Sequence, residues 1–131
     1  MIVIDSSALV AILRNEPDAL LFAEAIGAAD SAIVSAVNFF EISMVLAGSA
    51  HGGTVWIPLD ALLIRAKIAV IPFDTEQAGF ARAAFLKYGK GRHPAALNFG
   101  DCAAYALAKS KGIPLLYKGA DFAKTDIVSA L

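Results

Sequence analysis

The sequence predicts an α/β fold, with a central parallel sheet flanked by helices on both faces. Short apolar segments rich in β-branched residues recur along the chain, and longer segments of helical character separate them. No repeat, low-complexity tract or long linker interrupts this alternation. Strands that alternate with helices pair in parallel and are covered by the helices. Because 131 residues are enough for one compact domain but not comfortably for two, we expect a single domain over residues 1–131.

The N-terminal half is expected to contribute two strands and four helices. Each expected strand is a short apolar run, and two residues mark helix starts: Pro17 fits a first helical turn, and Ser35 is a favoured N-cap. The expected strands are Met1–Ile4 and Ala32–Val34, the expected helices are Ser6–Leu13, 17–26, Ala36–Ala47 and 54–67, and 48–53 is expected to be a loop.

The C-terminal half is expected to contribute two helices and three strands. Asp74 and Gln77 have the spacing of a capping box, and Gly112 is a favoured helix stop. The next helix is expected to open at Asn98 or Gly100. The expected helices are 74–88 and 98–111, the expected strands are 69–71, 113–117 and 126–128, and 89–96 is expected to be a loop rich in Gly, Pro and basic residues.

The composition requires a membrane protein to be considered first. Hydrophobic residues make up 58% of the chain and the mean hydropathy is +0.65. The longest apolar segments, Ala19–Ala29 and Ala32–Leu46, each contain a glutamate and are shorter than the roughly 20 residues of a membrane span. No basic stretch precedes the first apolar run, as a signal peptide would require. We therefore expect a soluble cytoplasmic protein without membrane contact, whose apolar excess is buried in a homodimer or against a partner protein.

Cysteine, histidine and net charge exclude some functions and leave others open. Cys102 is the single cysteine, so neither an intrachain disulfide nor a cysteine-based zinc site is possible, and His51 and His93 are too few for zinc. The formal net charge of −1 neither supports nor excludes nucleic-acid binding, which needs only a local basic patch.

Three aspartates map to one edge of the predicted sheet. Asp5 follows the first strand, Asp101 begins a helix, and Asp121 lies just beyond the strand 113–117. Ligands of open parallel sheets bind beyond the carboxyl ends of the strands, where these residues are expected. Each aspartate alone also has an ordinary explanation, as a strand terminator, a favourable acid at a helix N-terminus or a turn residue.

Glu41 is expected to point inward from its helix. It lies four residues after Val37 and three before Met44, on one helical face with Phe40. A buried carboxylate is costly without a partner. A salt bridge could stabilise such a carboxylate, but the chain has no Lys or Arg between Asn15 and Ile64. A bound metal ion would stabilise it equally well. Carboxylates that meet repel one another, and Mg²⁺ would relieve this repulsion while binding phosphate oxygens. Such a site can polarise a phosphodiester and activate water.

Three segments of the sequence resemble one known family. They are M-I-V-I-D-S-S-A-L-V-A-I-L at the start, S-A-V-N-F-F-E-I-S-M-V-L around Glu41, and L-N-F-G-D-C with L-L-Y-K-G-A-D-F near the end. Together they resemble PIN domains, most strongly the VapC-type toxins of bacterial type II toxin–antitoxin systems. The last segment is the most specific, and the resemblance is weakest between residues 48 and 76.

This resemblance implies an α/β/α sandwich with an acidic pocket that holds one or two Mg²⁺ or Mn²⁺ ions. It implies endonucleolytic cleavage of RNA and neutralisation by a cognate VapB-type antitoxin. It assigns the core acids as Asp5, Glu41 and Asp101. Many relatives carry Asp or Asn where this chain has Ala120, so Asp121 is the nearest candidate for a fourth acid and Asp126 a weaker one.

Further residues are candidates for supporting roles. Ser7 and Asn98 match polar positions that could orient the acids or a bound water. Basic residues near the acids could contact the RNA backbone, although an ordinary solvated loop is the alternative. These basic residues are Lys90, Arg92, His93 and Lys118.

Two rival functions belong to other classes. A phosphoacceptor signalling domain also has acids at the carboxyl edge of an open sheet, but it would carry adjacent acids in its first loop, where Asp5 stands alone. A PIN domain without nuclease activity could act as a binding module, although all three core acids are present.

Overall fold

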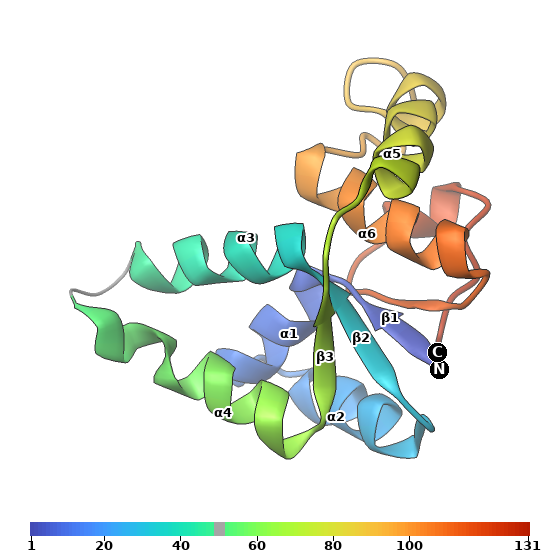
Figure 1. Ribbon diagram of the computed structural model, residues 1–131. Helices are drawn as coiled ribbons and strands as arrows, with labels where there is room; N and C mark the ends of the chain where they lie inside the picture. The colour runs from blue at the N-terminus through green and yellow to red at the C-terminus, as the bar shows by residue number, and fades with distance from the viewer. Residues whose placement is uncertain (49–51) are drawn as a thin grey trace.

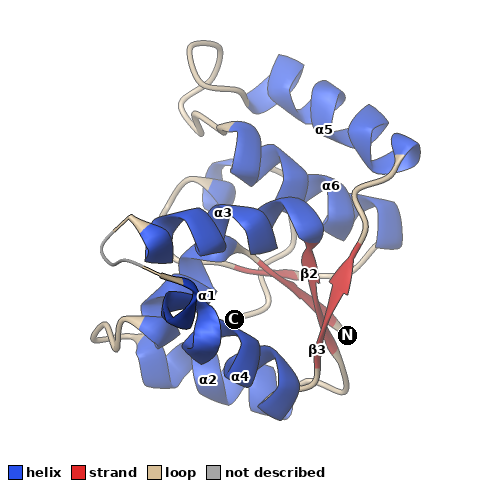
Figure 2. Cartoon of the chain, turned by 60° about the vertical axis from the view of Figure 1, so that its left-hand side comes forward, coloured by secondary structure: helices blue, strands red, loops and turns tan. Residues whose placement is uncertain are grey.

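The computed structural model describes residues 1–48 and 52–131 and has three layers, with a parallel sheet between two groups of helices (Figure 1, Figure 2). The predicted fold class is therefore confirmed. The strands are β1 (Ile2–Ile4), β2 (Ala32–Ser35), β3 (Ile68–Ile71) and β4 (Leu115–Leu116). The α-helices are α1 (Ser6–Leu13), α2 (Ala19–Ala28), α3 (Ala36–Ala47), α4 (Ile57–Arg65), α5 (Thr75–Tyr88) and α6 (Phe99–Lys111), and the 3₁₀ helices are η1 (Gly53–Trp56) and η2 (Phe122–Lys124).

The sheet brings the ends of distant segments to one edge. Its strand order is β3-β2-β1-β4, and every pair is parallel, with Val3 of the central strand paired to Ile33 on one side and Leu115 on the other. The carboxyl ends of all four strands therefore meet at the same edge. Figure 1 shows α3 leaving the upper end of β2, with the first turn of α6 beside it.

Two apolar cores lie on opposite faces of the sheet. Alternate residues of β1 divide between them: Ile2 and Ile4 pack with α1, α2, α3 and α4, whereas Val3 packs with α5 and α6. Helix α6 is the most deeply buried helix, because every residue from Cys102 to Ala108 is buried. Its alanines allow close packing, and it ends at Gly112, which adopts a left-handed conformation with φ of 65°.

Several predicted boundaries are wrong. The helix predicted from residue 54 begins as η1, and α4 starts only at Ile57, because Pro58 is tolerated in the first helical turn and not beyond it. Helix α2 begins at Ala19 rather than Pro17. Only half of the expected capping box forms at α5. The Asp74 Oδ1 accepts a hydrogen bond from the Gln77 backbone N, but the Gln77 side chain donates to the Pro72 carbonyl and does not bind the Asp74 backbone.

The last predicted strand is also wrong. Residues 126–128 form no strand; Leu115 makes an isolated bridge with Ser129 instead, because β4 has only two residues and offers little edge for pairing. Part of the loop predicted at 48–53 lies outside the described residues, since the structure omits 49–51. Within the described chain, no helix has both the length and the apolar character needed to cross a membrane.

Candidate active site

Asp5 is a buried carboxylate at the junction of β1 and α1. It caps α1, and its Oδ2 accepts hydrogen bonds from the Ser7 backbone N (3.0 Å) and the Ser7 Oγ (2.6 Å). Only 4% of the residue is exposed. Burial raises the Asp5 pKa from 3.8 to about 7; the Ser7 hydrogen bonds oppose this rise, and the charges of Asp101 and Glu41 add to it.

Asp101 lies in the first turn of α6 and completes a capping box there. The Asn98 Oδ1 accepts from the Asp101 backbone N (2.9 Å), and the Asp101 Oδ2 accepts from the Asn98 backbone N (3.0 Å). Asn98, not Gly100, therefore opens the helix. Partial burial raises the Asp101 pKa, the Asn98 hydrogen bond lowers it, and the negative charges of Glu41 and Asp121 raise it further.

Glu41 reaches the same region from α3. Its Oε1 accepts hydrogen bonds from the Ser6 Oγ and from the Asn38 Nδ2, the latter at 3.3 Å. Gly100 lies directly against this carboxylate: a β-carbon at Gly100 would stand 2.6 Å from the Glu41 Cδ. The absence of a side chain at Gly100 is what lets the first turn of α6 approach Glu41.

The predicted inward face of α3 is wrong in part. Phe40 and Met44, which were expected beside an inward-pointing Glu41, are 63% and 53% exposed. The buried residues of α3 are Asn38 and Ile42 instead, and Glu41 is half-buried at the border between the two faces. Both faces of α3 carry apolar residues, so helical periodicity could not decide which one is covered.

The structure brings Asp5, Glu41 and Asp101 close enough for their charges to act on one another. Among the described residues, no Lys, Arg or His forms an ion pair with any of the three. Each carboxylate has one oxygen held by hydrogen bonds from the chain, whereas Asp5 Oδ1, Glu41 Oε2 and Asp101 Oδ1 accept none from the described residues. Desolvated, mutually repelling carboxylates with unused oxygens suit a divalent cation.

No three His, Cys, Asp or Glu side chains in residues 1–48 and 52–131 stand close enough to share a metal ion in this arrangement. This is compatible with Mg²⁺, which typically binds through one or two carboxylates and keeps several waters. The all-oxygen donor set and the raised pKa values of Asp5 and Asp101 both fit such an ion, because a nearby cation favours the charged carboxylates.

The two candidates for a fourth acid differ in their surroundings. Asp121 is exposed at the start of η2, and its charge contributes to the raised pKa of Asp101. Asp126 is engaged elsewhere: it accepts a hydrogen bond from the Tyr105 hydroxyl and pairs with the Lys109 Nζ at 2.9 Å. The pKa of Asp126 is lowered by these two partners, although desolvation opposes them.

The basic candidates are placed differently from one another. Lys90 and Arg92 are exposed in the loop between α5 and α6. His93 supports that loop, because its Nδ1 accepts from the Ala95 backbone N (3.0 Å) and its ring meets Tyr88 edge-on. The Lys118 Nζ is bound by carboxylates of the loop after α1, Glu16 at 2.8 Å and Asp18 at 3.0 Å, while the Lys118 backbone N donates to the Ser7 Oγ.

Sequence reasoning missed three residues of this site: Ser6, Asn38 and Gly100. Ser6 and Asn38 both hydrogen-bond to Glu41, and Gly100 packs against it. One available signal was the spacing of three residues between Asn38 and Glu41, which puts two polar side chains on one face of an apolar helix.

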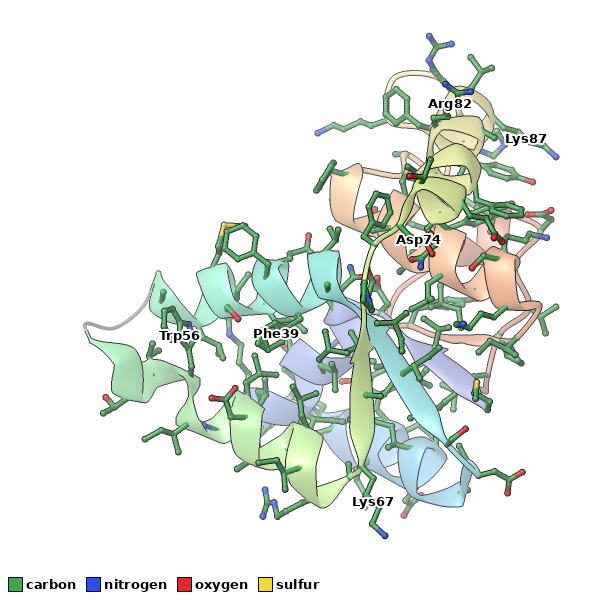
Figure 3. All side chains as sticks on the ribbon, viewed as in Figure 1. Phe39, Trp56, Lys67, Asp74, Arg82 and Lys87 are labelled. Carbon is green, nitrogen blue, oxygen red and sulfur yellow. The ribbon has the colours of Figure 1, made fainter. Side chains whose placement is uncertain are left out.

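An open apolar groove of about 790 Å³ adjoins the acidic residues. Glu41 and Gly100 lie at its border, and Phe99, 80% exposed, projects into it from α6. Along α3 the apolar surface continues toward Trp56, whose Nε1 donates to the Ser43 carbonyl (2.8 Å) and which Figure 3 shows between α3 and the start of α4. The other residues that line the groove are Ala36, Val37, Phe40, Met44, Pro72, Phe73 and Asn98.

Comparisons with known proteins agree with this architecture. A family model described as the PIN domain matches residues 2–128. A protein of Mycolicibacterium smegmatis named Ribonuclease VapC is 46% identical over 127 residues, which span 97% of this chain and 98% of the relative. Ribonuclease VapC30 of Mycobacterium tuberculosis is also 46% identical, over 97% of this chain and 96% of its own.

Solved structures show the same fold at low identity. VapC20 of Mycobacterium tuberculosis, described as a sarcin–ricin loop cleaving toxin, has a TM-score of 0.75 and 17% identity over 98% of this chain and 97% of its own. VapBC2 of Rickettsia felis, solved bound to a DNA fragment from its promoter, has a TM-score of 0.78 and 14% identity over 98% of this chain and 96% of that one.

Proposed function

Because the chain belongs to the PIN-domain family, we propose that it is a metal-dependent endoribonuclease and the toxin of a type II toxin–antitoxin system. The observation that carries this proposal is the meeting of Asp5, Glu41 and Asp101, three carboxylates without a cationic partner among the described residues, at the carboxyl edge of the sheet. Acids in this state favour divalent-ion chemistry over a purely structural role.

The proposed reaction is hydrolysis of an RNA phosphodiester. A divalent ion held by these acids would supply positive charge to the phosphate and lower the pKa of its bound water. The residues of the chain hold the ion and orient the substrate. Ser7 fixes Asp5 by two hydrogen bonds, and Asn98 fixes Asp101 through the capping box, so neither carboxylate has to be ordered when the substrate binds.

We assign Mg²⁺ as the ion, with Mn²⁺ as a substitute. Oxygen-only ligands and a phosphate substrate favour these hard cations over zinc. Asp5, Glu41 and Asp101 are the acids proposed to hold it, directly or through the waters that Mg²⁺ keeps. Asp121 is the proposed fourth acid, because its charge acts on Asp101, whereas Asp126 is hydrogen-bonded by the Tyr105 hydroxyl and paired with Lys109.

Among the basic residues, Lys90 and Arg92 are the better candidates for RNA backbone contacts. Both are exposed, and neither forms an ion pair in the described chain. His93 and Lys118 are proposed to act mainly by holding their loops, given their bonds to Ala95 and to Glu16 and Asp18.

Two protein partners are proposed. The relatives named Ribonuclease VapC and the solved structure of VapBC2 support a VapB-type antitoxin. The exposed apolar side chains around Phe40 and Phe99 support the expected homodimer, because patches of this kind are usually covered in solution.

The test compares RNA cleavage by the wild type, by Asp5→Asn and by the control Asp126→Asn, with Mg²⁺, with Mn²⁺ and with EDTA. We expect Asp5→Asn to lower the single-turnover rate on a labelled RNA pool by on the order of 100-fold or more, since a metal ligand is lost. Asp126→Asn should stay within about twofold of wild type, because Asp126 binds Tyr105 and Lys109 and its charge does not contribute to the pKa shifts of Asp5 or Asp101. Cleavage that persists in EDTA, or in Asp5→Asn, would refute the proposal. RNA binding by the wild type without cleavage would favour the inactive binding module.

A further inference from the structure

Asn38 is a fully buried amide at the point where α1, α3 and α6 meet. Its exposed fraction is 0%, and its Nδ2 lies within hydrogen-bond distance of an oxygen on each element: the Ser6 Oγ (3.1 Å), the Glu41 Oε1 (3.3 Å) and the Gly100 carbonyl (3.0 Å). Ser6 is the neighbour of Asp5 in the sequence, and Gly100 the neighbour of Asp101. One side chain therefore contacts the surroundings of all three core acids.

The chemistry of these partners fixes how the amide points. The Gly100 carbonyl can only accept a hydrogen bond, so the nitrogen of Asn38 has to face it. The reversed amide would place an oxygen against this carbonyl and against the Glu41 carboxylate. The Asn38 Oδ1 consequently points away, buried and without a hydrogen-bond partner in the described chain. An unsatisfied buried acceptor is costly, which argues that the donor side of this amide serves a purpose.

We propose that Asn38 is a positioning residue, which fixes the Glu41 carboxylate and ties α3 to the first turn of α6. This inference rests on the proposed metal-dependent function. A glutamate side chain has three rotatable bonds, and no Lys, Arg or His within residues 1–48 and 52–131 forms an ion pair that would restrain Glu41. Together with Ser6, Asn38 holds Oε1, and its bond to Gly100 sets where Asp101 lies relative to Glu41. Donors that orient ligands in this way tune metal affinity without touching the metal.

The chain offers a matched control for this role. Gln77 of α5 is also a buried amide, 3% exposed, whose Nε2 donates to the Pro72 carbonyl (2.9 Å) and whose Oε1 has no partner in the described chain. Among the interactions of the described residues, Gln77 makes no hydrogen bond to any of the three acids. Gln77→Leu and Asn38→Leu should therefore both destabilise the fold, but only the second should disturb the acidic pocket.

The first experiment measures Mn²⁺ affinity by electron paramagnetic resonance of the free ion. We expect about 10- to 100-fold weaker Mn²⁺ binding in Asn38→Leu, the usual effect of losing a residue that orients a metal ligand. Gln77→Leu should bind Mn²⁺ within about twofold of wild type. If Asn38→Leu does not fold, Asn38→Ser replaces it, since serine keeps the site polar and small.

The second experiment asks whether Asn38 acts through Glu41. In a Glu41→Gln background, adding Asn38→Leu should weaken Mn²⁺ binding by no more than about threefold, because the carboxylate that Asn38 orients is gone. A full additional 10-fold loss would indicate a merely structural role and overturn the inference. Wild-type affinity in folded Asn38→Leu would overturn this inference alone, whereas failure of the wild type to bind Mn²⁺ would overturn the proposed function as well.

Discussion

The acidic pocket and the apolar groove share the first turn of α6 but differ in how complete they are. Gly100 packs against Glu41 inside the pocket, whereas its neighbour Phe99 is 80% exposed in the groove. In the pocket, hydrogen bonds from Ser7, Asn38 and Asn98 hold each carboxylate by one oxygen. The groove instead presents large apolar side chains that the described chain leaves uncovered. Hydrogen bonds within one chain therefore fix the three carboxylates, whereas the exposed side chains of the groove would be covered only by a second protein.

The strongest way to separate the two regions is Asp101→Asn. The asparagine keeps an oxygen that can accept from the Asn98 backbone, so α6 should stay capped and the free energy of unfolding should change by less than about 1 kcal/mol. RNA cleavage should nevertheless fall by on the order of 100-fold or more, because the carboxylate charge is lost. Sedimentation velocity should show unchanged self-association. A variant that cleaves normally would remove Asp101 from the proposed ligands.

Next in size is the pH dependence caused by Asp5. Its native pKa of about 7 lies above the ordinary 3.8, so between these values the folded chain holds a proton that the unfolded chain has released. The contribution of Asp5 to stability is therefore present below about pH 4 and is lost as the pH rises to about 7. Without metal, Asp5→Asn should be more stable than wild type at pH 8 by on the order of 2 to 4 kcal/mol, and equally stable near pH 4.

Urea unfolding of both proteins in EDTA, at intervals from pH 4 to 8, checks this prediction. Asp101 also has a raised pKa, so the free energy of unfolding of Asp5→Asn should still fall as the pH rises, but less steeply than that of the wild type. Stability that rises with pH in the wild type relative to Asp5→Asn would mean that the Asp5 carboxylate is stabilised in the fold, not penalised by burial.

A substitution in the groove is expected to have the smallest effect on RNA cleavage by the acidic pocket. Phe99→Ser removes an exposed ring, so the free energy of unfolding should stay within about 0.5 kcal/mol of wild type and RNA cleavage within about twofold. Self-association should weaken, by about tenfold if Phe99 is central to the contact. Leu107→Ala is the contrasting variant, because Leu107 is fully buried in α6 and its truncation should cost about 2 to 5 kcal/mol. An unchanged dimerisation constant in Phe99→Ser would place the homodimer contact elsewhere.

The fold was predictable because its signals are local. Apolar runs that alternate with helical segments specify a parallel layered sheet, and a residue that follows a strand, such as Asp5, must lie at the carboxyl edge. The start of α6 was predictable for the same reason, since Asn98 and Asp101 have the spacing of a helix cap.

What escaped prediction depends on contacts between distant segments. The exposure of Phe40 was missed because periodicity relates residues within a helix and does not say which face another element covers. The bond from Asn38 to the Gly100 carbonyl joins residues 62 positions apart, and no spacing rule reaches that far. The pairing of Asp126 with Lys109 likewise follows from how the C-terminal segment returns along α6.

The capping box of α6 limits how Asp101 can bind any ion. Its Oδ2 already accepts a hydrogen bond from the Asn98 backbone N, so a cation that bound both carboxylate oxygens would have to share Oδ2 with that bond. Ca²⁺ often binds carboxylates through both oxygens and tolerates irregular coordination geometry. Mg²⁺ usually binds a carboxylate through one oxygen and keeps several waters as its other ligands. We therefore expect the hydrogen bond at the start of α6 to favour Mg²⁺ over Ca²⁺ at this carboxylate.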